Sequence, residues 1–280
     1  MERIGVAIIA FQRPALLRQL LQSLERQTCL ENASFHQFQE GAVSVFDGQP
    51  RAPESVIRDS VQVFLQSSLP RKQLHTRPTQ VGTAIHQYGA VSWMVKQYER
   101  VLILEEDVIV SPHYLRLAGI LFEQIRDRSD IYGFSLGFRK MCLAEHAQDH
   151  LAEMRYGTPH WWDIGFWASS WAKILPHFLE YYALVRGVDY RNRPSDAIRT
   201  LYEAKGWHQQ ATSQDGGKDM AVHAAGMKRI VAVVNRGVST GAKGEHFRPA
   251  EFHRMGLDEQ KPYVFTEDAT LERFVLPEVT

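Results

Sequence analysis

The chain has 280 residues, 44% of them hydrophobic, and it carries 32 basic and 32 acidic side chains. This length and apolar fraction suit one large domain with a sizeable core. The balanced charge gives no reason to expect nucleic acid as a partner.

The cysteines and the apolar segments of the chain indicate where in the cell the protein is expected. Cys29 and Cys142 do not form a C-x-x-C pair, which favours a reducing compartment. The start of the chain lacks a basic segment followed by an apolar run, and no stretch approaches the roughly 18 apolar residues of a membrane-spanning helix. We therefore expect a cytoplasmic protein, with peripheral association with a membrane left open.

Strands and helices alternate along the first half of the chain. Residues 4–11 are rich in β-formers, and Pro14 begins a helix whose leucines recur at helical spacing. Residues 30–41 are predicted to be a loop, and residues 43–46 a strand that ends at Asp47-Gly48. The later elements are a helix over 54–68, a strand near 74–76, a helix from Gly82 to about Tyr98, a strand over 101–104, a helix that begins at Ser111-Pro112, and a strand near 132–135.

This alternation predicts an α/β fold with a mostly parallel sheet and helices on both faces. After residue 140 the pattern loosens, with aromatic residues clustered in 156–182 and one more strand at 230–234. No repeat or linker divides the chain. We therefore expect a single domain over residues 1–280 with an elaborated C-terminal half.

The strand at 101–104 is followed at once by Glu105, Glu106 and Asp107. Three adjacent carboxylates repel one another, and a divalent cation is the simplest partner for them. Their hard oxygens suit Mg²⁺ or Mn²⁺, and Mg²⁺ usually combines one or two carboxylates with substrate phosphates. Ligands of open α/β sheets gather at the carboxyl ends of the strands. The segment therefore predicts a metal-assisted site, and a solvated acidic turn is the alternative.

Two residues near the other strand ends are candidates for the same site. Asp47 is placed to accept hydrogen bonds from a ribose or a base, although a plain Asp-Gly turn explains it equally well. Arg13 follows the first strand and is placed to hold a phosphate or a base, against the alternative of a solvated arginine. The chain has no G-x-G-x-x-G motif and no P-loop. These absences argue against dinucleotide oxidoreductases and P-loop NTPases.

The second half of the chain offers three further candidate segments. Four of the six tryptophans fall in residues 156–171, where their rings can stack on sugars or fill the core, and Asp163 among them can accept hydrogen bonds from sugar hydroxyls. Asp215 and Asp219 flank two glycines in a predicted flexible loop, and either is a candidate general base or a helix cap. Residues 235–246 are rich in glycine and contain Lys243 and His246, which suits a loop that closes over a diphosphate. His246 is also a candidate metal ligand.

Taken in order, these segments resemble the GT-A fold glycosyltransferases, especially N-acetylglucosaminyltransferase I-like and bacterial family-two-like enzymes. The resemblance implies a Rossmann-like sheet, with a nucleotide-binding half over 1–140 and an acceptor and catalytic half over 141–280. It implies a UDP-sugar donor, a glycan or glycoconjugate acceptor, and Mn²⁺ or Mg²⁺ as cofactor. By the same resemblance Asp107 and His246 hold the metal, and Asp219, or failing that Asp215, is the base. The donor contacts it implies are Arg13, Asp47, Glu105, Glu106, Asp163 and Lys243.

Two rival functions remain. Sugar-1-phosphate nucleotidyltransferases share the sheet and the metal chemistry, but they begin with a glycine-rich, basic loop that the segment Phe11-Gln12-Arg13-Pro14 does not match. A catalytically silent carbohydrate-binding protein of the same fold is the other rival, and hydrolysis of a donor would separate it from an enzyme.

Overall fold

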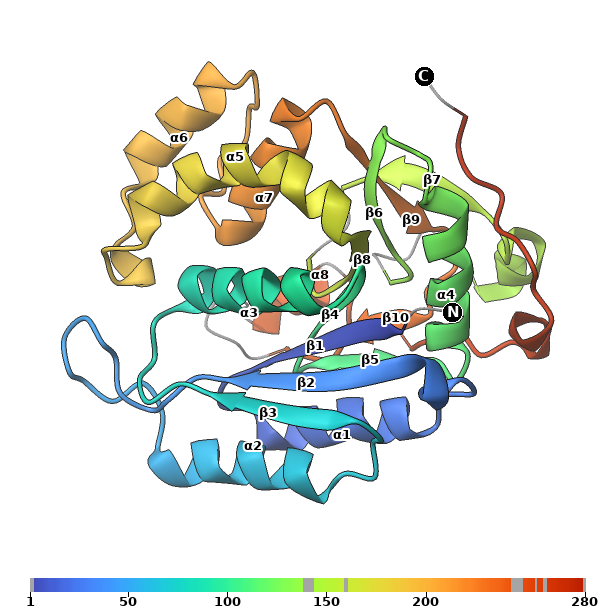
Figure 1. Cartoon of the computed structure of the whole chain (residues 1–280), viewed down its shortest axis with the longest axis horizontal. Coiled ribbons are helices and arrows are strands. Elements are labelled where there is room, and N and C mark those ends of the chain that lie inside the picture. The colour runs from blue at the N-terminus through green and yellow to red at the C-terminus, as the bar shows by residue number, and fades with distance from the viewer. Residues whose placement is uncertain are drawn as a thin grey trace.

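An eight-stranded sheet forms the middle layer of the protein, as seen in a computed structural model (Figure 1). The structure describes residues 3–137, 144–158, 161–242, 249–254, 256–258 and 261–278. The strands lie in the order β3 (Lys72–Thr76), β2 (Ala33–Gln39), β1 (Ile4–Ala10), β4 (Arg100–Glu105), β8 (Asp163–Trp167), β6 (Ile131–Ser135), β9 (Lys228–Ala232) and β7 (Met154–Gly157). A separate small sheet pairs β5 (Val108–Val110) with β10 (Gly237–Ser239).

Strand direction confirms a mostly parallel sheet. β3, β2, β1 and β4 pair in parallel, and so do β6 and β9. β8 lies antiparallel between β4 and β6, and β7 is antiparallel at the far edge. Both halves of the chain therefore contribute strands to one sheet, and the Trp-rich segment supplies its antiparallel strand β8.

Helices cover both faces of this sheet (Figure 1). One face packs against α1 (Pro14–Glu25), α2 (Glu54–Gln66) and α4 (Tyr114–Ile125). The other packs against α3 (Thr83–Gln97), α5 (Ala168–Val185), α6 (Ser195–Ala204) and α7 (Gln214–Ala224). Shorter elements are α8 (Pro249–Arg254) and the 3₁₀ turns η1 (Leu30–Asn32), η2 (Ala144–His150), η3 (Tyr190–Asn192) and η4 (Thr266–Ala269).

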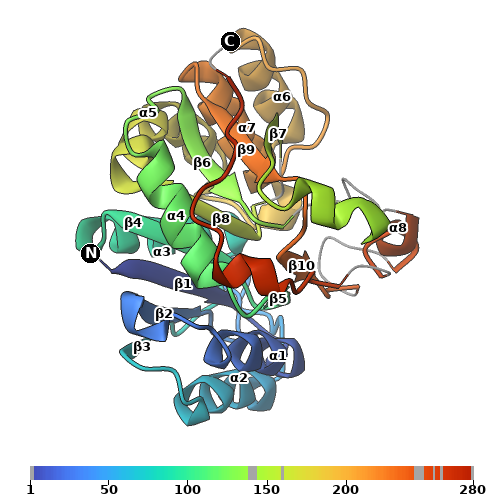
Figure 2. The ribbon, with the colours of Figure 1, turned by 90° about the vertical axis from the view of Figure 1, so that its right-hand side faces the viewer.

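The C-terminal segment runs back along α4 (Figure 2). Arg116 donates to the backbone oxygens of Asp268 and Leu271, which fixes the segment to the helix. Arg236 and Asp268 form a fully buried ion pair at 2.7 Å, directly before β10 begins. The C-terminal segment therefore also supports the start of the small sheet.

The strand order places a topological switch point between β1 and β4. The chain passes from β1 to β2 and β3 on one side, and then returns through α3 to β4 on the other side of β1. Crevices at such points, at the carboxyl ends of the strands, bind ligands in open α/β sheets. Arg13 follows β1 and Glu105 ends β4, so both lie at this position.

One strand of the sheet contradicts the sequence prediction. Residues 33–39, predicted as loop, form the fully buried β2, whereas residues 43–46, predicted as a strand, make only isolated bridges in the next loop. The polar side chains of β2 find partners inside the protein: His36 contacts Tyr98 at 2.8 Å, and Gln39 donates to the carbonyl of Phe11 at 2.7 Å. The acid at the end of this strand is therefore Glu40 rather than Asp47.

The predicted start of the fourth helix is also wrong by a few residues. α4 begins at Tyr114, its preceding residue His113 makes no capping hydrogen bond with its side chain, and the hydroxyl of Ser111 has no hydrogen-bond partner in the described part of the chain. The starts at Pro14 and after Gly82 are confirmed, and Gly82 adopts a positive φ of 83° that suits glycine. Among the described helices, none has the length and apolar character to cross a membrane.

Candidate functional site

Glu106 holds the loop that follows β1. Its carboxylate accepts a hydrogen bond from the backbone amide of Phe11 at 2.9 Å, and a 2.8 Å hydrogen bond from Nε of Arg13. The residue is 2% exposed, so these contacts are shielded from water. Glu106, a predicted donor contact, therefore uses both of its oxygens to fix the β1–α1 loop beside the tip of β4.

Asp107 has a buried carboxylate oxygen without a partner in the described part of the chain. Its Oδ2 accepts from Nη1 of Arg13 at 2.6 Å, whereas its buried Oδ1 has no hydrogen-bond partner among the residues that the structure describes. A buried polar atom without a partner is costly. Burial alone would lower the pKa of Arg13, but the charges of Asp107 and Glu106 outweigh it and raise the pKa. Arg13 therefore stays a cation beside these two carboxylates.

The small sheet brings the C-terminal half against Asp107. β10 pairs antiparallel with β5, and the backbone amide of Thr240 then donates to the carbonyl of Asp107 at 2.7 Å. Gly241 follows so closely that a Cβ at this position would lie 1.9 Å from Oδ2 of Asp107 and 2.9 Å from Nη1 of Arg13. This close approach explains why glycine occupies position 241.

A chain of polar contacts links Glu105 to α7. Oε1 of Glu105 accepts from Nε2 of Gln87 at 2.7 Å, and Oε1 of Gln87 accepts from Nζ of Lys218 at 2.9 Å. Lys218 in turn lies 3.3 Å from Oδ1 of Asp215. Burial, and then the charges of Asp107 and Asp215, raise the pKa of Glu105 to about 7. The acidic tip of β4 and the acids of α7 are thus linked by side-chain contacts inside the protein.

Asp215 and Asp219 lie one helical turn apart in different surroundings. Both belong to α7, whose first turn is capped by the hydroxyl of Ser213, so the predicted flexible loop is a helix. The side chain of Asp215 is 39% exposed, whereas that of Asp219 is 14% exposed and accepts from Trp161 and Arg229. Burial raises the pKa of Asp219, and Arg229 opposes the shift. Of the two predicted bases, Asp215 is the more exposed.

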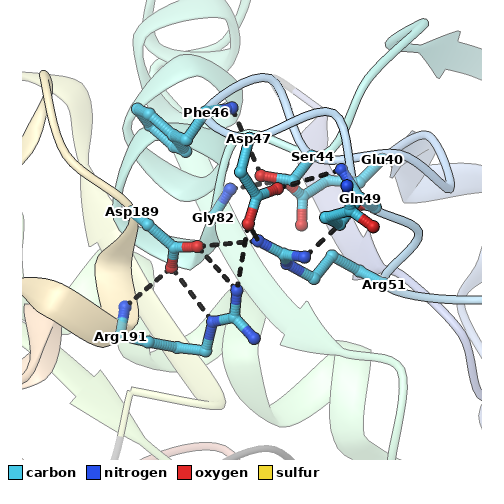
Figure 3. Close-up of polar contacts among 9 residues, drawn as sticks. All are labelled: Glu40, Ser44, Phe46, Asp47, Gln49, Arg51, Gly82, Asp189 and Arg191. Carbon is cyan, nitrogen blue, oxygen red and sulfur yellow. Dashed lines mark hydrogen bonds and ion pairs between the residues drawn. The ribbon is translucent and has the colours of Figure 1, made fainter.

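Asp47 lies in the loop between β2 and α2, with its side chain 44% exposed (Figure 3). Its carboxylate meets Arg51 at 2.6 Å, and Arg51 also meets Asp189 at 2.8 Å. Arg191 joins the same group at 2.7 Å from Asp189. We call these four residues the charged clasp. The clasp connects the loop after β2 with η3, and so ties the two halves of the chain together.

Glu40, at the end of β2, occupies the position that the sequence assigned to Asp47. Its Oε1 accepts from the backbone amide of Val81 at 2.7 Å and from that of Gly82 at 2.9 Å, just before α3 begins. Figure 3 shows Glu40 beside Gly82. Negative charge at a helix N-terminus is favourable. Glu40 therefore orients the start of α3, the helix that carries Gln87 toward the site.

Asp163 and the tryptophans near it are buried. Asp163 is 0% exposed, and its oxygens accept from Ser135 at 2.6 Å and Tyr114 at 3.2 Å. Burial raises the pKa of this carboxyl well above its usual range, although the two hydrogen bonds oppose the shift. The four tryptophans of this region are also buried: Trp161, Trp162, Trp167 and Trp171. The predicted sugar contacts therefore have no exposed surface here, and these side chains frame the site instead.

Two predicted residues, Lys243 and His246, lie outside the described residues. The described part of their segment ends at Ala242. The residue before it, Gly241, lies against Asp107. Within the described ranges, no group of three histidine, cysteine or acidic side chains is arranged to hold a metal ion. The unpartnered Oδ1 of Asp107 fits a single protein ligand, which suffices for Mg²⁺ when substrate phosphates and water complete its shell.

Sequence reasoning missed the residues that connect these groups. Gln87 lies within α3 and belongs to no motif that marks a site, and Lys218 lies between Asp215 and Asp219, where the sequence pattern pointed only to the two acids. Arg51 and Asp189 are 138 residues apart and meet only in the folded chain. A signal did exist for Lys218, since a lysine beside two acids and two glycines is unusual for a buried helix face.

Comparison with known proteins shows a shared fold. The chain matches no protein-family model, and no curated protein matches it in sequence. Among solved structures it is similar to S. aureus TarS 1–349 in complex with UDP-GlcNAc, with a TM-score of 0.51 and 10% identity over 90% of this chain and 64% of that one. A second crystal structure of S. aureus TarS 1–349 matches with a TM-score of 0.50 and 9% identity, over 86% of this chain and 61% of that one.

These matches place the sheet and its helices in the GT-A fold, as the sequence predicted. The chain spans less than two thirds of the length of each TarS 1–349 structure.

Proposed function

We propose that the chain is a glycosyltransferase that moves a sugar from a UDP-linked donor to a hydroxyl of a glycan or glycoconjugate, with inversion at the anomeric carbon. The observation that carries the proposal is the convergence of Arg13, Glu105 and Asp107 with Asp215 at the switch point between β1 and β4. The complex of TarS with UDP-GlcNAc, a protein of similar fold, supports the choice of a UDP sugar. Residues 1–140 form the nucleotide-binding half of one domain, and residues 141–280 form the acceptor half.

Arg13 and Asp107 are the residues proposed to meet the donor diphosphate. Arg13 is a quarter exposed and holds a permanent charge, and Asp107 has one oxygen free to bind a cation. A divalent cation, Mn²⁺ or Mg²⁺, would neutralise the diphosphate as it leaves. Asp47, Lys243 and His246 remain predictions as further contacts to the donor or the metal.

Asp215 is the proposed general base. It would take the proton of the acceptor hydroxyl while that oxygen forms a bond to the anomeric carbon, and the electron pair of the breaking bond would leave with the diphosphate. Its exposure and its link to Glu105 support this role, whereas Asp219 is held by Trp161 and Arg229. Glu106 and Asp163 are assigned to the frame of the site.

A direct test is donor hydrolysis, in which water replaces the acceptor. The protein is incubated with UDP-glucose, UDP-galactose, UDP-GlcNAc or UDP-GalNAc, with Mn²⁺ or with chelator, and released UDP is measured. We expect release from at least one donor with Mn²⁺ only. UDP binding without release from any donor would instead indicate a silent carbohydrate-binding protein. Absence of both binding and release would contradict the proposal.

A further inference from the structure

Lys218 is a buried cation at the centre of the site's polar contacts. It belongs to the first turns of α7 and is only 5% exposed. Its Nζ donates to Oε1 of Gln87 at 2.9 Å, lies 3.3 Å from Oδ1 of Asp215, and sits 4.5 Å from the centre of the Trp161 ring. Lys218 thus meets a carboxylate, an amide and an aromatic face in one enclosed space.

Fold stability does not explain a lysine at this position. Removing an ammonium from water is costly, and here burial lowers the pKa of Lys218 despite the nearby acids. Replacing buried ion pairs by apolar residues of similar size is often neutral or stabilising. Trp161, whose ring Lys218 contacts, belongs to an apolar cluster, so an apolar side chain at position 218 would have apolar neighbours. A gain other than stability is therefore needed to account for Lys218.

Lys218 contacts one carboxylate directly, that of Asp215, and a second one, that of Glu105, through Gln87. A neutral amide has one donor end and one acceptor end, and Gln87 points its donor end at Glu105 and its acceptor end at Lys218. The Glu105 carboxylate requires the donor end of the amide and the Lys218 ammonium requires its acceptor end, so the two contacts together fix which way the amide faces. Lys218 therefore orients Gln87, which orients Glu105 at the tip of β4, while the ammonium also faces Asp215 directly.

We propose that Lys218 is a positioning residue, which holds the Asp215 carboxylate directly and the Glu105 carboxylate through Gln87 at the spacing that the transfer reaction requires. This inference rests on the proposed function, because it assigns Asp215 the role of base. Misplacing a reacting group by about 1 Å can reduce a rate by about 100-fold. Lys218 does not itself touch the donor or the acceptor.

The test compares Lys218→Met, which keeps the length and removes the charge, with Lys218→Arg, which keeps the charge. We expect Lys218→Met to lower kcat for Mn²⁺-dependent UDP release by about 10- to 100-fold, with donor KM within about threefold of the unaltered protein. Its Tm should fall only modestly, because Oε1 of Gln87 loses its donor but the Asp215 carboxylate that is left without its partner is 39% exposed. Lys218→Arg should recover part of kcat.

A second variant follows the contact through Gln87. Gln87→Leu should lower kcat, and the double variant Gln87→Leu/Lys218→Met should lose less than the product of the two single losses, because both changes break one network. If Lys218→Met does not fold, Gln87→Leu alone decides, and full kcat in that variant overturns the proposal.

Three results would overturn the proposal while leaving the proposed function intact. They are full kcat in Lys218→Met, a fall of kcat together with a large fall in Tm and a loss of UDP affinity, and equal kcat in the Met and Arg variants. Failure of the function itself is seen separately, as absence of UDP release from the unaltered protein.

Discussion

The tip of β4 and the first turns of α7 both carry closely spaced carboxylates. At each place one acid is better able than its neighbours to meet a ligand, but for a different structural reason. At β4, Glu106 is fully used by the β1–α1 loop, Glu105 is met on one oxygen by Gln87, and Asp107 keeps a buried oxygen that has no partner within the described structure. On α7 the two acids differ in exposure: the side chain of Asp219 is 14% exposed and faces Arg229, whereas that of Asp215 is 39% exposed. In both regions the partners, rather than the spacing of the acids, determine which one can meet a ligand.

The largest expected effect separates the two acids of α7. Asp215→Asn should lower transfer or donor hydrolysis by about 10²- to 10⁴-fold, the usual contribution of a general base, with a smaller loss of stability than Asp219→Asn, because Asp215 is 39% exposed and Lys218 keeps its contact with Gln87. Asp219→Asn should do the opposite: it removes the charge that faces the buried Arg229, at a cost of about 3 kcal/mol in unfolding free energy, with kcat of the folded protein nearly unchanged. Steady-state kinetics and urea unfolding of both variants provide the measurement.

The reverse pattern would move the base to Asp219, as the family resemblance suggested. Equal kinetic losses in both variants would mean that the contrast in burial has no bearing on the chemistry. Product stereochemistry, read by NMR at the anomeric carbon, adds an independent check, because retention would be inconsistent with a single displacement assisted by either acid.

A smaller effect on activity is expected from a substitution at Gly241, where the C-terminal half contacts Asp107. In Gly241→Ala the added methyl would lie 1.9 Å from Oδ2 of Asp107, so the carboxylate or the chain must shift. We expect kcat/KM to fall about tenfold, which corresponds to about 1.4 kcal/mol of transition-state stabilisation. Gly119→Ala is the matched control, because a Cβ at Gly119 meets nothing within 4 Å and alanine favours the helix α4. Equal activity of both variants would show that Gly241 does not limit the site.

The tip of β4 was predictable from sequence because its signal is local. An apolar strand followed directly by three acids fixes both the strand and its end, and the parallel alternation around it indicates which edge of the sheet it joins. The helix starts at Pro14 and Gly82 were predictable for the same reason, since each depends on one residue with a restricted or permissive backbone.

The remainder depended on partners that are distant in sequence. β2 was missed because its polar residues suggest a loop, although His36 and Gln39 are satisfied by Tyr98 and Phe11 in the folded chain. The distinction between Asp215 and Asp219 depends on Arg229 and Trp161, which approach from β9 and from the segment before β8. The charged clasp likewise joins residues from both halves, so no local pattern could predict it.

The most direct test of the account is calorimetric titration of UDP into the protein with Mn²⁺ and with chelator. We expect UDP to bind at least about tenfold more tightly with Mn²⁺, and this difference to vanish in Asp107→Asn, because the variant lacks the carboxylate charge at the switch point. Asp196→Asn, which removes a fully exposed acid on α6, should retain the difference. Equal UDP affinity with and without Mn²⁺ in the unaltered protein, or a metal effect that survives in Asp107→Asn, would contradict the assignment of Asp107 and with it the proposed site.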